Sequence, residues 1–194
     1  MATALFRLMP PDAQWGDYGR ILVHGMAARL PRTAEGFVQL ERTGPYIPPM
    51  TFPSGAIIVT DRFRSELTTS GLTGFSFKPV VKRCIVELHW EEWDRSRGDP
   101  EHYPRGGEPE DHILRGEHSE STSNALGPLW ELQPTGKAMI SKPRKRLRVV
   151  HSSWNGSDIA ESEPLCFTIV SDKARQWLSN AIPNLVKFES VDLD

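Results

Sequence analysis

Residues Ile57 to Val80 read IIVTDRFRSELTTSGLTGFSFKPV, and residues Thr168 to Val191 read TIVSDKARQWLSNAIPNLVKFESV. Aligned without gaps from their first residues, the two stretches share seven identical positions. Chance would give roughly one or two identities over such a window, so we interpret the stretches as a duplicated supersecondary unit. The identical pairs are Ile58/Ile169, Val59/Val170, Asp61/Asp172, Arg64/Arg175, Leu67/Leu178, Phe77/Phe188 and Val80/Val191.

Each copy has the pattern of a strand, a short helix and a second strand. In the first copy the β-branched run Ile57–Val59 predicts a strand, and Thr60 or Asp61 can cap the helix that follows. That helix is expected at about 62–70, with Gly71 as its left-handed stop. The second copy repeats this order of elements with equivalent residues.

Two such units predict an α+β fold, with one mixed sheet and the short helices on one face of it. Neither copy is large enough to bury a core alone, so we expect a single domain over residues 1–194. Its internal repeats lie at about 57–80 and 168–191. The stretch from 12 to 50 is expected to be irregular, apart from extended backbone at Ile21–His24 and a half-buried strand at Phe37–Glu41, where apolar and polar residues alternate.

The composition is that of a globular protein of ordinary size. With 38% hydrophobic and 25% charged residues, the 194-residue chain is typical of soluble proteins. A net charge of −2 argues against a dedicated nucleic-acid binder, which usually carries a basic excess. No apolar run approaches the roughly 20 residues of a membrane helix, and the first residues lack the pattern of a secretory signal. The two cysteines, Cys84 and Cys166, stand beside apolar residues, which favours reduced core thiols. We therefore expect a cytoplasmic protein that binds no membrane.

An acidic and His-rich insert at about 91–125 separates the two copies. Imidazole and carboxylate ligands together suit zinc or iron, but the spacing matches neither HExxH nor paired CxxC. We therefore expect the insert to be a solvent-exposed loop that carries exposed histidines, with no metal and no cofactor. A small metal-dependent enzyme remains the alternative function, with a site built from nearby acids and His89, His112 and His118.

Tryptophans accompany the acids of this insert, which is a pattern typical of protein-binding surfaces. Aromatic side chains dominate binding hot spots, and acidic rims speed association with basic partners. The other interpretation is that the tryptophans are core residues and the acids a solvated loop; it is favoured for Trp90, which shares its strand phase with Cys84 and Val86. The residues expected to contact a protein partner are Glu91, Glu92, Trp93, Asp94, Glu108, Glu110 and Asp111.

Other chemistry-bearing patterns are weaker. The basic run Lys142–Arg148 (KPRKRLR) offers a third function, weak nucleic-acid binding, but it lacks interleaved aromatic residues and is better explained as a charged surface. The serine cluster at 119–123 and the triplet His151–Ser153 occur without a GxSxG elbow, so serine-type catalysis is not expected. The sequence thus predicts a protein that is not an enzyme.

Most of the chain resembles an uncharacterised bacterial protein family, through LERTGPYIPPMTFPSGAIIVTDRFRSELTTSGLTGFSFKPV, YPRGGEPEDHILRGEHS, WNGSDI and FTIVSDKARQWL. More distantly, the twofold pattern around Asp61 and Asp172, with the endings Phe77–Val80 and Phe188–Val191, is similar to the double-CxxCG immunity proteins. Those proteins neutralise toxins delivered between neighbouring bacteria. Both CxxCG zinc motifs are absent here, so the resemblance implies no structural zinc, and no motif marks toxin-contacting residues.

The resemblance implies an immunity protein, one half of a toxin–antitoxin pair. Its partner would be a cognate toxin encoded nearby, and nucleic acid is not an expected partner. The expected mechanism is occlusion, in which a preformed surface, the acidic segment Glu91–Glu120 with Trp93, covers the active site of the toxin.

Overall fold

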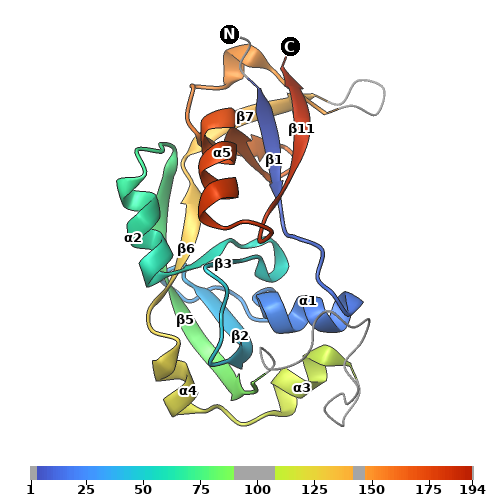
Figure 1. The fold of residues 1–194 in the computed structure, drawn as a ribbon, viewed down its shortest axis with the longest axis vertical. Helices are drawn as coiled ribbons and strands as arrows, with labels where there is room; N and C mark the ends of the chain where they lie inside the picture. The colour runs from blue at the N-terminus through green and yellow to red at the C-terminus, as the bar shows by residue number, and fades with distance from the viewer. Residues whose placement is uncertain (1–3, 90–107, 142–146, 194) are drawn as a thin grey trace. The chain divides into compact units, whose positions relative to one another are not determined.

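The computed structural model describes residues 4–89, 108–141 and 147–193, and it contains both helices and strands (Figure 1). The expected α+β class is confirmed. By their internal contacts the residues form two compact units: unit 1 consists of Met1–Pro11, Arg64–Phe77 and Leu132–Asp194, and unit 2 of Asp12–Phe63 and Lys78–Glu131. The single domain over 1–194 stays a prediction.

Unit 1 is built on a closed sheet. Among the described residues, its strands follow one another in the order β1-β10-β9-β7-β8-β11. Strand β1 lies between β10 and β11 and pairs antiparallel with both. In this register Leu5 is opposite Ser171 of β10 and Val191 of β11. The bounds of the strands are β1 (Leu5–Met9), β7 (Gly136–Ser141), β8 (Arg148–Val149), β9 (Ile159–Glu163), β10 (Thr168–Ser171) and β11 (Lys187–Leu193).

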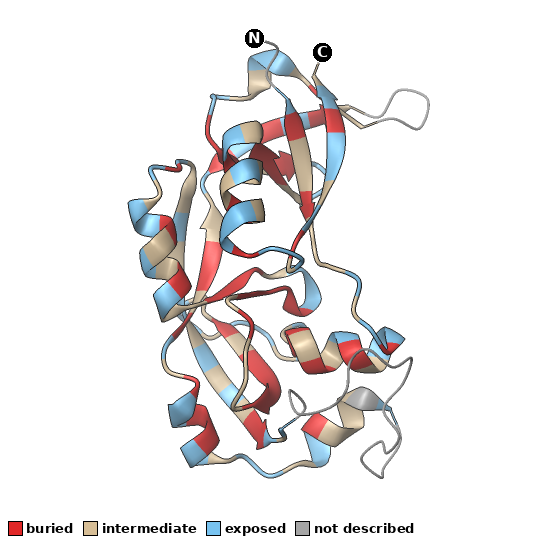
Figure 2. Cartoon of the chain, viewed as in Figure 1, coloured by how far each residue is buried: buried red, intermediate tan, exposed pale blue. Residues whose placement is uncertain are grey.

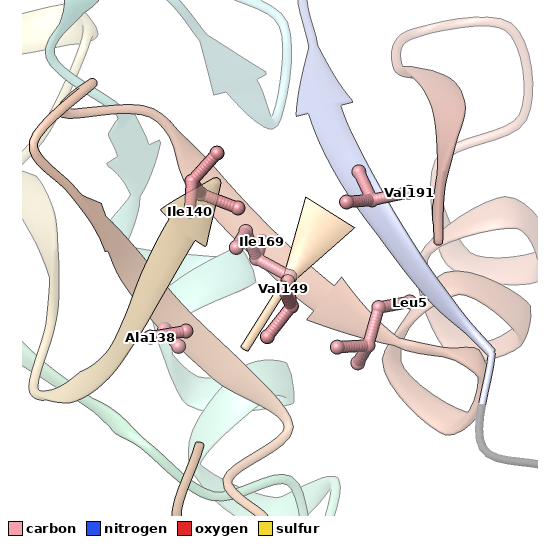
Figure 3. Packing of buried hydrophobic residues seen from close by; sticks show 7 residues of the cluster. Leu5, Ala138, Ile140, Val149, Ile169 and Val191 are labelled. Atoms are coloured by element: carbon pink, nitrogen blue, oxygen red, sulfur yellow. The ribbon is translucent and has the colours of Figure 1, made fainter. Parts of the chain in front are cut away.

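Alternating side chains fill the interior of this closed sheet. In β7, Ala138 and Ile140 are buried whereas Lys137 and Met139 are exposed, as the two-residue period of a strand requires. Figure 3 shows the buried residues of several strands gathered in one cluster. Complete burial of a valine, leucine or isoleucine side chain stabilises a fold by about 1.5–3 kcal/mol. The labelled residues are Leu5, Ala138, Ile140, Val149, Ile169 and Val191.

Helix α5 (Asp172–Ala181) packs on β1 and β10. The hydroxyl of Ser171 accepts a hydrogen bond from the backbone N–H of Ala174 at 3.2 Å and so caps the helix. Ala174 and Leu178, one turn apart, are its buried residues (Figure 2).

The second sheet has most of its residues in unit 2. Among the described residues its strand order is β2-β5-β6-β4-β3. Strands β2 and β5 are parallel, whereas β4 is antiparallel to both β3 and β6. The remaining elements are α1 (Gly16–His24), β2 (Val38–Gly44), β3 (Met50–Thr51), β4 (Ile58–Thr60), α2 (Asp61–Thr69), β5 (Phe75–Glu87), α3 (Pro109–Arg115), α4 (Glu120–Ala125) and β6 (Leu129–Pro134).

The expectation of one mixed sheet is wrong. The strands of the first copy, β4 and β5, belong to the second sheet, whereas those of the second copy, β10 and β11, belong to the closed sheet. The physical reason is that another strand separates the two strands of each stretch: β6 lies between β4 and β5, and β1 lies between β10 and β11. Each copy therefore completes its hydrogen bonds with a different part of the chain.

Three local expectations are also wrong. Ile21–His24 is helical, at the end of α1, because Leu22 packs with Trp15 while Arg20 faces water; a short apolar run does not distinguish helix from strand. Residues 109–115 and 120–125 of the insert are helices and not loop. Cys166 is exposed, in a turn at φ 52°, so only the half-buried Cys84 approaches a core position.

In the part of the chain that the structure describes, no helix has the length and apolar character needed to cross a membrane.

Candidate functional site

The described part of the acidic insert begins with α3, which is firmly anchored in unit 2. Pro109 at the first helical position and Glu110 and Asp111 in the first turn are the residue types that favour a helix start. Ile113 is fully buried, and α3 packs on α1 and β2. The Sγ atom of Cys84 lies 3.8 Å from the carbonyl oxygen of Ile113, within the range of a weak sulfur hydrogen bond.

The residues after α3 are tied to strand β5. The backbone N–H of Ile85 donates to Nδ1 of His118 at 3.0 Å, and the N–H of Ser119 donates to the carbonyl oxygen of Ile85 at 2.8 Å. Gly116 lies so close to β5 that an added Cβ would be 2.6 Å from Val86 Cγ2. The end of the α3 segment is therefore positioned by backbone contacts.

The exposed and half-buried residues of the α3 segment include four carboxylates and one leucine. Leu114 is 39% exposed, Glu108 and Glu117 are exposed, and Glu110 and Asp111 are half-buried. We call these five residues the α3 surface. Arg115 offsets part of the negative charge through an ion pair with Asp111, in which Nη2 lies 3.1 Å from Oδ2. The α3 surface therefore combines one exposed apolar side chain with four carboxylates, a suitable contact for a basic protein surface.

Three of the seven predicted partner-binding residues are described, and they lie together at the start of α3: Glu108, Glu110 and Asp111. The other four, Glu91, Glu92, Trp93 and Asp94, lie outside the described residues, as does Trp90. Trp130 is half-buried on β6, where its indole Nε1 donates to Oδ1 of Asp61 at 2.8 Å.

The histidines of the alternative metal site have separate surroundings. Nε2 of His89 lies 3.4 Å from Oε1 of Glu87, whereas His118 contacts Glu120 through its own Nε2 at 3.2 Å. Burial lowers the pKa of His112, which is half-buried. Among the described residues, no group of three or more His, Cys, Asp or Glu side chains is placed to hold a metal ion. His102 lies outside them.

One serine in each of the two serine-rich stretches has a structural role. Ser119 caps α4 by accepting a hydrogen bond from the N–H of Thr122 at 3.3 Å. Ser153 links β7 to the turn at 151–153, since its Oγ accepts from the N–H of Met139 at 2.8 Å and donates to the carbonyl oxygen of Val150 at 2.6 Å. Of the basic run, residues 142–146 lie outside the described residues, and Arg148 begins β8.

Sequence reasoning missed a group of buried charges in unit 2. Glu41 and Glu131 are buried, and each accepts two hydrogen bonds from a half-exposed arginine of the loop after α1. Arg32 donates through Nη1 and Nη2 to the two carboxylate oxygens of Glu131, both at 2.7 Å, whereas Arg29 donates to those of Glu41 through Nε and Nη2. In the sequence these residues look like the solvent side of a strand and an ordinary polar loop, so no motif indicates the pairs.

Arg42 and His24 are buried more deeply than these pairs. Arg42 is 0% exposed; its Nε donates to the carbonyl oxygen of Thr43 at 2.8 Å and its Nη2 to that of Tyr46 at 3.0 Å. Burial lowers the pKa of this guanidinium to about 9. His24 is 2% exposed, and burial, followed by the charges of Arg20 and Arg42, lowers its pKa to about 4.

Comparison with protein-family models, with curated proteins and with solved structures found no match to this chain.

Proposed function

We propose that this protein is a protein-binding module, and specifically an immunity protein that neutralises a cognate bacterial toxin by covering its active site. The observation that supports this function is the α3 surface: Leu114 exposed among carboxylates on an anchored helix. A rigid apolar contact with an acidic rim favours fast association and a well-defined complex with a basic partner. The resemblance to the double-CxxCG immunity proteins supplies the toxin as the class of partner.

The duplication of the strand-helix-strand unit is part of the same proposal. Its support is that the equivalent residues Thr60 and Ser171 both cap the helix of their copy, by accepting hydrogen bonds from Phe63 and Ala174. The matched leucines, Leu67 and Leu178, are both fully buried, and each copy takes a third strand between its own two. If the ancestral unit already had a third strand between its own two, its duplication would account for the positions of both β6 and β1.

Affinity purification from the native host, with the neighbouring genes co-expressed, tests the proposal. We expect a stoichiometric protein partner that is toxic when expressed alone and harmless when this protein is present. The triple variant Glu108→Lys, Glu110→Lys, Asp111→Lys should lose the partner and the protection. The control, Glu189→Lys with Asp192→Lys, reverses exposed charges on β11 of unit 1 and should retain both.

Two results would contradict the proposal. Recovery of the chain without any protein partner is one; undiminished protection by the folded triple variant is the other, and it would remove the α3 surface from the mechanism. The proposal also states that the protein is not an enzyme and needs no cofactor, so stoichiometric metal in the purified protein, lost together with protection on chelation, would favour the metal-dependent alternative.

A further inference from the structure

The arginines of unit 2 differ in how their charges are balanced. Arg29 and Arg32 are each about half exposed and still have a carboxylate partner, with 48% of the side chain accessible in both. Arg42 is 0% exposed, yet among the described residues its only hydrogen-bond acceptors are the two backbone carbonyl oxygens, and its Nη1 has none. Because a charge buried without a counter-charge is costly, buried guanidinium groups are nearly always paired. Within the described part of the chain, Arg42 therefore has no anionic partner.

His24 is close enough to Arg42 for the charge of Arg42 to lower the pKa of its ring, and its Nε2 also has no acceptor among the described residues. Met26 and Glu41 exchange two backbone hydrogen bonds, of 2.7 and 2.9 Å, which hold the residues after α1 against β2. An added Cβ at Gly25 would be only 2.7 Å from the Cβ of Arg42. His24 Nδ1 accepts the N–H of Phe52 at 3.2 Å, so the neutral ring carries its proton on Nε2. Nε2 is buried and has no partner among the described residues, so it is an unused N–H donor.

Two buried hydroxyls stand next to these residues in the chain. Thr43 follows Arg42, and Thr51 precedes Phe52; both are 0% exposed, and neither Oγ1 has a hydrogen-bond partner among the described residues. Buried polar atoms without partners are rare in folded proteins and mark places where an ion or water binds. The unpartnered nitrogen atoms, Nη1 of Arg42 and Nε2 of His24, are both donors, so they favour an acceptor with negative charge.

We propose that Arg42 and His24 form a binding site for one small oxyanion inside unit 2, with Arg42 Nη1 and His24 Nε2 as the donors that hold it. The chemical class is a small carboxylate or a phosphate-like anion, since oxygen acceptors match both the guanidinium and the imidazole N–H. Burial restricts the ligand to a small ion. The site is separate from the α3 surface and does not depend on the proposed partner, so each can fail alone.

Binding is measured on the purified full chain by urea denaturation with added sulfate, phosphate or acetate, with chloride used to keep the ionic strength constant. We expect a saturable rise of the denaturation midpoint at millimolar concentrations for at least one of these oxyanions. The concentration at which the rise saturates then shows whether the site prefers a tetrahedral ion (sulfate or phosphate) or a planar one (acetate). Choline chloride at the same ionic strength should give no saturable rise.

Variants assign the effect to the two donors. Arg42→Gln should abolish the saturable rise, and His24→Asn, which keeps an acceptor for the N–H of Phe52, should weaken the apparent affinity about tenfold, as loss of one charge-assisted hydrogen bond implies. Arg115→Gln removes an exposed arginine of the same unit and should bind as the wild type does.

A crystal soaked in selenate provides a readout that does not require the Arg42 variant to fold. An anomalous peak within hydrogen-bond distance of Arg42 Nη1 and His24 Nε2 supports the site. The inference is overturned if the wild type shows no saturable rise with any of the three oxyanions, or if the folded His24→Asn variant binds as tightly as the wild type. Where sulfate or phosphate gives the saturable rise, selenate found only at other positions also overturns it.

Discussion

The buried imidazole of His24 should make this protein lose stability in mild acid. His24 is 2% exposed, and its pKa is lowered from 6.5 to about 4 by burial, by Arg20 of its own helix and by Arg42 of β2. The folded state therefore keeps the ring neutral where the unfolded chain has already taken up a proton. The stabilising contribution is complete above pH 6.5, is lost as the pH falls from 6.5 toward 4, and stays constant below that.

The shift sets the size of the effect. A difference of about 2.5 pKa units corresponds to at most about 3.4 kcal/mol in the free energy of unfolding. Between pH 7 and pH 5 the same two pKa values predict a loss of about 2 kcal/mol from His24 alone. This is a large part of the 5–15 kcal/mol that is typical of a folded protein.

Urea denaturation followed by tryptophan fluorescence measures this loss in a buffer without oxyanions. The matched variant is His24→Asn, whose side-chain oxygen can still accept the hydrogen bond from the N–H of Phe52 but which does not titrate. We expect the variant to lose about 2 kcal/mol less than the wild type between pH 7 and pH 5. If both proteins lose the same amount, the ring of His24 is not held neutral by its surroundings and the reasoning fails.

Three further predictions concern packing, ion pairs and caps in the two units. Gly136→Ala should destabilise unit 1 by about 3 kcal/mol or more in thermal unfolding, because the new Cβ would lie 2.0 Å from Ser157 Oγ. Gly71→Ala should cost only about 1 kcal/mol, because Gly71 has a φ of 73° but no atom within 4 Å of the new Cβ. Equal costs for the two variants would contradict the packing described at Gly136. In urea denaturation, Arg32→Gln should cost about 1–2 kcal/mol more than Glu131→Gln. Loss of Arg32 leaves the buried carboxylate of Glu131 unpaired, whereas loss of the Glu131 carboxylate leaves a half-exposed guanidinium that water can reach. The opposite order would show that Glu131 is not held as a buried anion. Ser171→Ala should cost about 1 kcal/mol more than Thr60→Ala, since the hydroxyl of Ser171 both caps α5 and donates to Oδ1 of Asp158 at 2.7 Å; calorimetry that finds no difference would remove the second bond from the account.

The sequence was most informative where one residue type has one local consequence. The caps and buried leucines of both copies follow from side-chain chemistry within a few residues, and so the elements β4, α2, β10 and α5 could be placed. The partners of the strands could not, because β1 and β6 come from distant parts of the chain and no local pattern specifies them. Ile21–His24 shows the same limit at a smaller scale: its apolar run fits a strand or a helix, and only packing with Trp15 decides.

The candidate sites divide in the same way. The acids of α3 were predictable because an accumulation of one charge is visible in any sequence. Arg42 was not predictable, because an arginine is rarely buried without a charged partner, and its burial depends on the loop after α1. His24 gave no signal either, because its environment includes Arg42 of β2 and Phe52, which lie later in the chain.

The place of β1 between β10 and β11 has a consequence for synthesis. Among the described residues, β1 pairs with β10 and β11, which lie far later in the chain, so the closed sheet cannot form until β11 has been made. During that time β1 has unpaired backbone groups along both edges. A free peptide with the sequence of β1 can pair with β10 and β11 in its place, so it should compete with β1 during refolding.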